Sequence, residues 1–192
     1  VLACVSGGSD SRALLDILNH ARRFKPKFEL HAVHFNHKLR GEEAEEDERF
    51  VANVVEQTDG LDSFIVRSWD NNDRRSQEAA RQWRESELLQ IVSETLGDRH
   101  VAIALGHHSD DSIETILMKI LRGSSLISLQ GISKVVVDSK SGLVKLRPLL
   151  GFAKSELMNY LTDLGLDWRE DSSNVSCDYQ RNRIRNRLVP LL

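Results

Sequence analysis

Short apolar runs alternate with stretches of helical periodicity along residues 1–121 of the chain. The runs that predict strands cover residues 1–5, 28–34, 64–66 and 101–105. Apolar residues then recur at three- and four-residue intervals, which predicts helices around 14–21, from about residue 43, over 79–92 and over 113–121. Strands that alternate with helices in this way indicate crossover units on a parallel sheet.

The pattern changes after Arg122. Strands are expected at 135–137 and 144–146, as a hairpin or an edge element, and a helix over 152–164 ends at Gly165. We therefore expect one α/β domain over residues 1–192, with a doubly wound, mainly parallel five-stranded sheet and helices on both faces. Its core covers about 1–150, and a small helical extension covers about 151–192.

Composition narrows the class of protein. The 192 residues are 40% hydrophobic and 29% charged, which predicts a sizeable core and excludes a disordered chain or a disulfide-rich miniprotein. No apolar run approaches the roughly 18 residues of a membrane-spanning helix. The only cysteines are Cys4 and Cys177, and neither belongs to a CxxC pair. Both are expected to be free thiols in a reducing compartment.

The formal net charge of −3 hides an uneven distribution of charged residues. An acidic run lies where the helix near residue 43 begins, and carboxylates are favourable at that positive end of a helix dipole. We therefore interpret the run as a solvated helix start rather than as a metal or partner site. Residues 181–192 hold four arginines and no acid. The acidic run consists of Glu42, Glu43, Glu45, Glu46, Asp47 and Glu48.

The segment at 6–11 lies between the first strand and the first helix and predicts an anion cradle. Two glycines let the backbone approach a ligand, and the free N–H groups of a helix start attract phosphate oxygens. The segment is neither a Walker A loop nor GxGxxG. A carboxylate at Asp10 inside a phosphate site indicates Mg²⁺, which reconciles the two negative charges. The cradle residues are Ser6, Gly7, Gly8, Ser9, Asp10 and Ser11.

A second polar segment, at 106–115, follows the strand at 101–105 and so lies at the same edge of the sheet. Ser109 is the expected N-cap of the next helix, Asp110 and Asp111 occupy its first turn, and Glu114 lies on the same face. Metal-dependent hydrolysis is an alternative interpretation of this segment. The competent metal ligands are His107, His108, Asp110 and Asp111.

A third polar segment, at 34–41, follows the second strand on the same rim. His34, Asn36 and Arg40 carry planar or forked polar groups that suit a base or a phosphate. This segment indicates a ligand site because it lies beside the other two segments.

The three segments together resemble the tRNA(Ile)-lysidine synthetase family, which belongs to the PP-loop ATP pyrophosphatases. The resemblance covers nearly the whole chain. SGGxDS occurs in many PP-loop enzymes, whereas HHxDDxxET, a following RG and a terminal RNRIR are far more selective. The matching stretches are SGGSDS, VHFNHKLRGEEAEEDERFV, EAARQWR, ALGHHSDDSIETILMKILRGSS, LQGI, RPLL, WREDSSN and RNRIRNRLVPLL. Arg12, Glu85, Ser112 and Ser125 depart from the usual residues, and none of them removes a catalytic group.

The resemblance implies a reaction. ATP adenylates the C2 oxygen of the wobble cytidine in a minor isoleucine tRNA, and the ε-amine of free L-lysine then displaces AMP to form lysidine. Pyrophosphate is the other product. The partners implied are therefore ATP with Mg²⁺, free lysine and the anticodon loop of the tRNA.

The resemblance also implies roles for residues of this sequence. Asp10 helps bind Mg²⁺, the lysine ammonium meets an acidic pocket, and His107 or His108 acts as a base or contacts the adenylate. The implied catalytic residues are Asp10, His107, Asp110, Asp111 and Glu114. ATP is held by Ser6, Gly7, Gly8, Ser9, Asp10, Ser11, His34, Asn36 and Arg40. Lysine is held by Asp110, Asp111 and Glu114. Phosphate or tRNA is contacted by Arg81, Arg84, Arg122, Arg181, Asn182 and Arg185.

The same resemblance bears on the domain organisation, the cellular compartment and the alternative functions of the protein. Members of the family carry C-terminal tRNA-binding domains that are not expected within residues 1–192. A bacterial source implies the cytoplasm, and a plant source implies a chloroplast or other organelle. A tRNA thiolase of the same group expects CxxC pairs or a catalytic thiol. A non-catalytic RNA-binding module is the other alternative, and it would tolerate loss of Asp10, Asp110 and Asp111.

Overall fold

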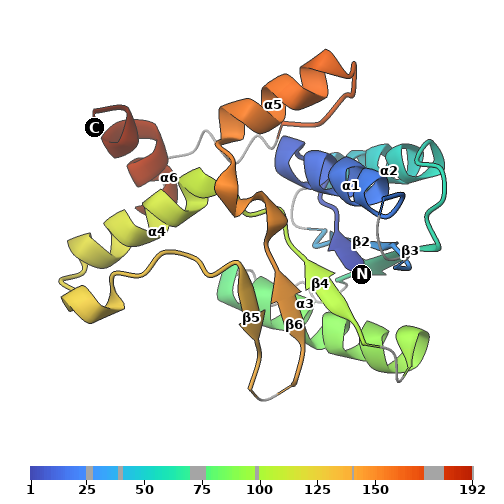
Figure 1. Ribbon diagram of the computed structural model, residues 1–192, viewed down its shortest axis with the longest axis horizontal. Coiled ribbons are helices and arrows are strands. Elements are labelled where there is room, and N and C mark those ends of the chain that lie inside the picture. The colour runs from blue at the N-terminus through green and yellow to red at the C-terminus, as the bar shows by residue number, and fades with distance from the viewer. Residues whose placement is uncertain are drawn as a thin grey trace.

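The computed structural model describes residues 1–24, 28–38, 41–69, 77–97, 100–139, 141–170 and 180–191. Six strands within these ranges form one sheet in the order β3-β2-β1-β4-β6-β5 (Figure 1). Neighbouring strands are parallel except for β5 and β6, so the expected mainly parallel sheet is confirmed. The strands are β1 Leu2–Cys4, β2 His31–Asn36, β3 Ser63–Ser68, β4 Ala102–Ala104, β5 Val135–Val137 and β6 Val144–Leu146.

The expected count of five strands is wrong, because both arms of the hairpin join the sheet. β6 pairs in parallel with β4, with Val144 opposite Ala102, and β5 pairs antiparallel with β6 at the edge. The second strand also begins later than its apolar run suggests. It covers His31–Asn36 because it pairs with β3 along its whole length.

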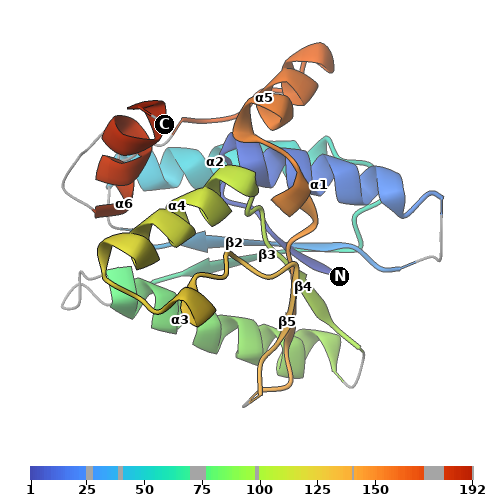
Figure 2. The ribbon, with the colours of Figure 1, turned by 60° about the vertical axis from the view of Figure 1, so that its left-hand side comes forward.

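Helices cover both faces of the sheet, as expected for a doubly wound fold. α1 and α2 lie on one face and α3 on the other (Figure 2). Among the described segments, no helix combines the length and the apolar character that a bilayer crossing requires. The helices are α1 Ser9–Ala21, α2 Glu42–Glu56, α3 Gln77–Ile91, α4 Ser109–Leu121, α5 Lys154–Asp163 and α6 Gln180–Arg183, which continues into a wider helical turn at Ile184–Leu188.

Three apolar clusters hold these layers together. Leu15 of α1 and Val51 of α2 belong to one cluster with strand residues, and Leu88 and Ile91 of α3 belong to a second cluster on the opposite face. Leu161 of α5 packs with α1 in the third. All five side chains are buried, so α1 is fixed on both of its sides, by the sheet and by α5.

The strand order reverses between β1 and β4. The chain runs from β1 outward to β2 and β3, and then returns to place β4 on the other side of β1. The loops after β1 and β4 therefore meet at one point, the position where ligands bind in open α/β sheets. They touch there: a Cβ atom at Gly106 would lie 3.2 Å from the backbone of Asp10 and Ser11.

The apolar face expected over 113–121 does not pack into the core. Ile113, Ile120 and Leu121 are 46%, 51% and 60% exposed, and the residues that α4 buries are Asp111 and Glu114. α4 extends away from the sheet and lies beside α6 (Figure 1). The helix was predicted correctly, but its apolar stripe does not face the core of the described residues.

Substitution of Gly106 by alanine tests the contact between the two loops. The added methyl group meets backbone atoms that have little room to move, so we expect the free energy of unfolding in urea to fall by about 1–3 kcal/mol. Gly151→Ala is the matched control, because a Cβ atom there meets nothing within 4 Å. Equal unfolding free energies for the two variants would contradict this account of the contact.

Candidate active site

The loop between β1 and α1 is closed by Ser11. Its Oγ accepts hydrogen bonds from the amides of Ser6, at 3.1 Å, and Gly7, at 3.2 Å, and donates to the carbonyl of Gly8 at 3.0 Å. Gly7 has a φ of 93°, which favours glycine. Among the described residues, the amides of Gly8 and Ser9 at the start of α1 have no acceptor. Such open amides make a site for an anion.

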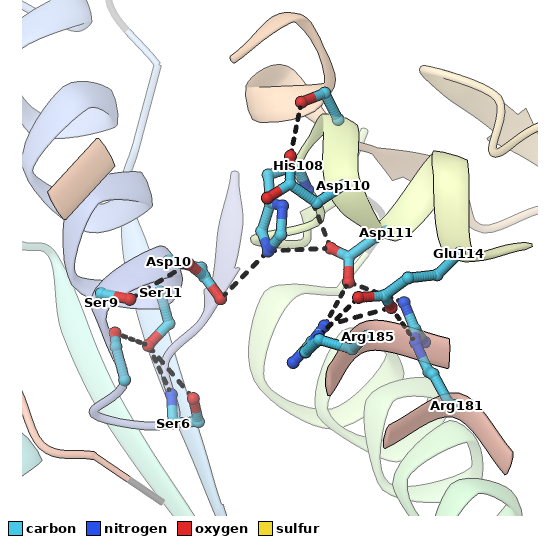
Figure 3. A network of polar contacts seen from close by, with 12 residues as sticks. Ser6, Ser9, Asp10, Ser11, His108, Asp110, Asp111, Glu114, Arg181 and Arg185 are labelled. Carbon is cyan, nitrogen blue, oxygen red and sulfur yellow. Dashed lines mark hydrogen bonds and ion pairs between the residues drawn. The ribbon is translucent and has the colours of Figure 1, made fainter. Parts of the chain in front are cut away.

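His108 connects this loop to α4. Its Nε2 atom lies 3.6 Å from an oxygen of Asp10 and 3.5 Å from an oxygen of Asp111 (Figure 3). The imidazole is 1% exposed. His108 is also the N-cap of α4, where the sequence predicted Ser109, because the Asp111 carboxylate reaches back to the His108 amide at 2.9 Å. The two segments predicted to share one edge therefore meet through a buried side chain.

Two arginines from the C-terminal segment bind the carboxylates of α4 (Figure 3). Arg181 lies 2.6 Å from Asp111 and 2.7 Å from Glu114. Arg185 lies 2.5 Å from Glu114 and 3.3 Å from Asp111. Glu114 is 1% exposed, and a buried carboxylate of this kind is stable only with charged partners. The sequence predicted phosphate or tRNA contacts for these arginines and missed their pairing with Asp111 and Glu114.

The charges of this cluster do not cancel. Asp10, Asp111 and Glu114 supply three carboxylates, whereas Arg181 and Arg185 supply two guanidinium groups. In the described part of the chain, the two arginines pair with Asp111 and Glu114 and not with Asp10, so the Asp10 carboxylate is the one left for a cation. Asp110 lies outside the cluster. Among the described residues, its carboxylate accepts a hydrogen bond from the Ser109 hydroxyl at 3.0 Å.

His107 occupies a different environment from His108. Its Nδ1 atom accepts a hydrogen bond from Nε of Arg147 at 3.3 Å. Burial lowers the pKa of His107 below its ordinary value. Asp111 opposes this change in the pKa, and the charge of Arg147 adds to it. His107 is therefore mainly neutral at pH 7, and because its Nδ1 atom accepts from Arg147, its proton lies on Nε2.

His34 and Asn36 face the interior of the protein. They are 4% and 3% exposed. His34 Nδ1 lies 2.8 Å from the carbonyl of Val5, and the Asn36 amide donates to Glu48 at 2.7 Å. In this structure both side chains support the loops at the ends of β1 and β2, and their direct contact with ATP stays a prediction.

The remaining predicted contact residues lie on the outside of the fold. Arg81 and Arg84 are exposed on α3, and Arg81 lies 3.8 Å from Glu85. Arg122 is exposed and donates to Gln180 at 3.0 Å, and Asn182 lies on α6. Arg40 lies outside the described residues. Contact of these residues with RNA stays a prediction.

Two residues at the site escaped the sequence analysis. Arg147 donates to His107, and the amide of Arg169 donates to the Gly7 carbonyl at 2.9 Å. Arg169 lies more than 150 residues from Gly7 along the chain, so no local pattern indicated the contact. The sequence held one signal for these two residues: Arg147 lies in the matching stretch RPLL, and Arg169 lies in WREDSSN.

Cys4 does not offer a reactive thiol. It lies in β1, and burial raises the pKa of its thiol to about 12. A thiol with so high a pKa carries almost no thiolate at pH 7. Cys177 lies outside the described residues.

Comparison with known proteins identifies a matching domain family and similar sequences over the whole chain. The PP-loop domain matches residues 1–192. The tRNA(Ile)-lysidine synthase of Geobacter sulfurreducens is 39% identical over 100% of this chain, and that of Bacteroides thetaiotaomicron is 34% identical over 100%. The chain spans 40% and 43% of these relatives' lengths.

A solved structure has the same fold. The U34-tRNA thiolase NcsA from Methanococcus maripaludis superposes with a TM-score of 0.77 over 99% of this chain and 65% of that one, at 18% identity. At this identity the likeness concerns the fold alone. The match over the full chain is decisive for the family, and the chain belongs to the PP-loop domain family.

Proposed function

We propose that this chain is the part of a tRNA(Ile)-lysidine synthetase that ligates lysine to C2 of the wobble cytidine in a minor isoleucine tRNA. ATP first adenylates the cytidine and releases pyrophosphate, and the lysine amine then displaces AMP. One observation carries the proposal. His108 joins Asp10 of an anion-binding loop to Asp111 of a carboxylate cluster, so sites for a phosphate and for an ammonium lie together. Similarity to lysidine synthases supports this choice of substrates.

The loop suits the pyrophosphate end of ATP. The open amides of Gly8 and Ser9 point along the start of α1, and the exposed Ser6 hydroxyl lies at the same turn. Backbone donors that are already fixed stabilise the charge that grows on a leaving pyrophosphate, since they need no reorganisation during the reaction. Ser9 and Ser11 are both buried. Ser11 holds the loop in this shape, and the Ser9 hydroxyl donates to the Asp10 carboxylate at 3.1 Å.

The residues present suit Mg²⁺ bound together with the nucleotide. In such sites the ion takes one or two carboxylates, and phosphate oxygens and water complete its coordination. Asp10 is that carboxylate, with a side chain 31% exposed. No group of three or more His, Cys, Asp or Glu among the described residues could hold an ion without the nucleotide. When bound, Mg²⁺ neutralises phosphate charge.

The carboxylate cluster suits the lysine ammonium. Asp110, on the first turn of α4, hydrogen-bonds to the Ser109 hydroxyl and supplies a carboxylate that attracts a cation. Asp111 and Glu114 already bind Arg181 and Arg185, so the ammonium shares these carboxylates with the guanidinium groups. The free-energy cost of removing water from the ammonium is offset by its attraction to these carboxylates.

His107 is our candidate for the base. The lysine ammonium must lose a proton before its nitrogen can attack C2. A neutral imidazole can accept this proton at Nδ1 when Arg147 releases its hydrogen bond to that atom. The lowered pKa of His107 keeps this side chain neutral. His108 lies between the carboxylates of Asp10 and Asp111. We assign it a positioning role, in which it holds these two carboxylates in place.

The exposed arginines suit the phosphates of the tRNA. Arg81, Arg84 and Arg122, with Asn182, offer donors around the site, and contacts of this kind weaken with rising salt. The target base of a single-stranded anticodon loop is splayed out, which exposes it to the loops after β1 and β4. Arg40 belongs to the same proposal from its position in the sequence.

Substitution of Asp10 by asparagine tests the proposed reaction. With transcribed minor isoleucine tRNA, ATP, Mg²⁺ and radiolabelled lysine, we expect incorporation of lysine to fall at least about 100-fold, as for loss of a main electrostatic stabiliser. Asp163→Asn, an exposed acid at the end of α5, is the control. ATP binding to the wild-type chain is measured in parallel. No incorporation of lysine, together with ATP-dependent activity that Asp10→Asn leaves unchanged, would contradict the proposal.

Substitution of Glu114 by glutamine tests the ammonium site. It leaves Arg185 and Arg181 short of one negative charge, so we expect the KM for lysine to rise about 10-fold or more, the equivalent of 1.4 kcal/mol. The Kd for ATP should stay within about twofold of wild type, because the phosphate loop is untouched. An unchanged KM for lysine in a folded variant would remove Glu114 from the site.

The pH dependence of lysine transfer tests His107. Its pKa is lowered from 6.5, so the basic form persists below pH 6.5 and is lost only as the pH falls through the lowered pKa. We expect transfer at saturating substrates to be constant near neutrality and to decline below pH 6.5. In His107→Gln this decline should disappear and the rate should drop about 10²–10⁴-fold. An identical pH profile in the variant would assign the base elsewhere.

A further inference from the structure

Residues 166–169, here called the strap, follow α5 and reach the anion-binding loop at Gly7. The strap begins where the amide of Leu166 closes α5 on Leu161, at 2.9 Å. Trp168 packs in the cluster shared by α1 and α5. The amide of Arg169 then donates to the carbonyl of Gly7 at 2.9 Å. The strap therefore contacts the loop directly, by way of a backbone hydrogen bond.

The Arg169 side chain fixes the strap to α2. Its Nη2 atom lies 3.0 Å from Glu46, and its Nε atom lies 2.6 Å from Asp47. Both partners belong to the acidic run that the sequence indicated as a solvated helix start. Two acids of that run therefore have a defined partner, and Glu48 has another in Asn36. The run anchors two segments at the rim of the site.

The hydrogen bond to Gly7 sets the direction of the next amide. The peptide bond between Gly7 and Gly8 is trans, so its C=O and N–H groups point in opposite directions. While the Gly7 carbonyl faces the strap, the Gly8 N–H faces away from it, toward the side where the start of α1 is open. The loop has little room on the α2 side, since a Cβ atom at Gly7 would lie 3.3 Å from Val51.

We propose that Arg169 is a positioning residue for the pyrophosphate end of ATP. Bound to Glu46 and Asp47, it holds the strap against the loop and keeps the Gly8 N–H directed at the phosphates. This inference rests on the proposed binding of ATP at this loop. It assigns to the acidic start of α2 a part in nucleotide affinity, although its side chains are not placed in contact with the nucleotide.

Arg169→Ala tests the inference. The amide of residue 169 remains, but its anchor is lost, so we expect the Kd for ATP and for inorganic pyrophosphate, both with Mg²⁺, to rise about 3- to 10-fold. The Kd for AMP, which lacks that end of ATP, should stay within about twofold, as should kcat. Arg49→Ala, on the surface of the same helix α2, is the control and should leave all of these values unchanged.

A charge exchange gives a second readout that loss of structure cannot imitate. Asp47→Arg should weaken ATP binding as Arg169→Ala does, and Asp47→Arg with Arg169→Asp should return the Kd to within about twofold of wild type. Wild-type ATP affinity in Arg169→Ala, or equal weakening of ATP and AMP, would overturn the positioning role alone. Failure of the wild-type chain to bind ATP would instead overturn the proposed function.

Discussion

The backbone contact between Gly106 and the first turn of α1 governs the geometry of the whole site. Parallel strands on either side of β1 bring the two loops to the same edge, and glycine at position 106 gives them room to pack closely, because a Cβ atom there would lie 3.2 Å from the backbone of Asp10 and Ser11. At this separation one imidazole, that of His108, spans from Asp10 to Asp111. The strand order sets where the site lies, and this contact sets how wide it is.

Charge replaces apolar packing at α4. α1, α2 and α3 bury leucine, isoleucine or valine against the sheet, whereas α4 buries Asp111 and Glu114 and leaves Ile120 and Leu121 exposed. Its N-terminal half is held by guanidinium groups from the C-terminal segment. A helix held in this way keeps its carboxylates oriented because each is bonded on more than one side, and it can present them to a cation without moving the core.

Local pattern predicted the fold and the location of the site, but not its long-range contacts. Asp10 and Asp111 each follow a strand of the same parallel sheet, so their shared edge follows from periodicity alone. The pairing of Arg185 with Glu114 spans 71 residues, and no spacing rule reaches so far. Polar residues at a strand end are equally ambiguous: Asn36 has the character of a ligand, yet its partner is Glu48. A hairpin or edge element was expected at 135–146, but the entry of both of its strands into the sheet depended on pairing, which hydrophobicity does not specify.

The C-terminal segment is attached at two places that differ in exposure. The arginines are similarly exposed, but their acids are not. Arg169 pairs with Glu46 and Asp47, which are 52% and 18% exposed, whereas Arg181 and Arg185 pair with Asp111 and Glu114, which are 10% and 1% exposed. Dissolved ions screen exposed pairs strongly and buried pairs weakly. Rising ionic strength therefore loosens the attachment beside the anion-binding loop before it affects the one on α4, and the two halves of the site respond separately to salt.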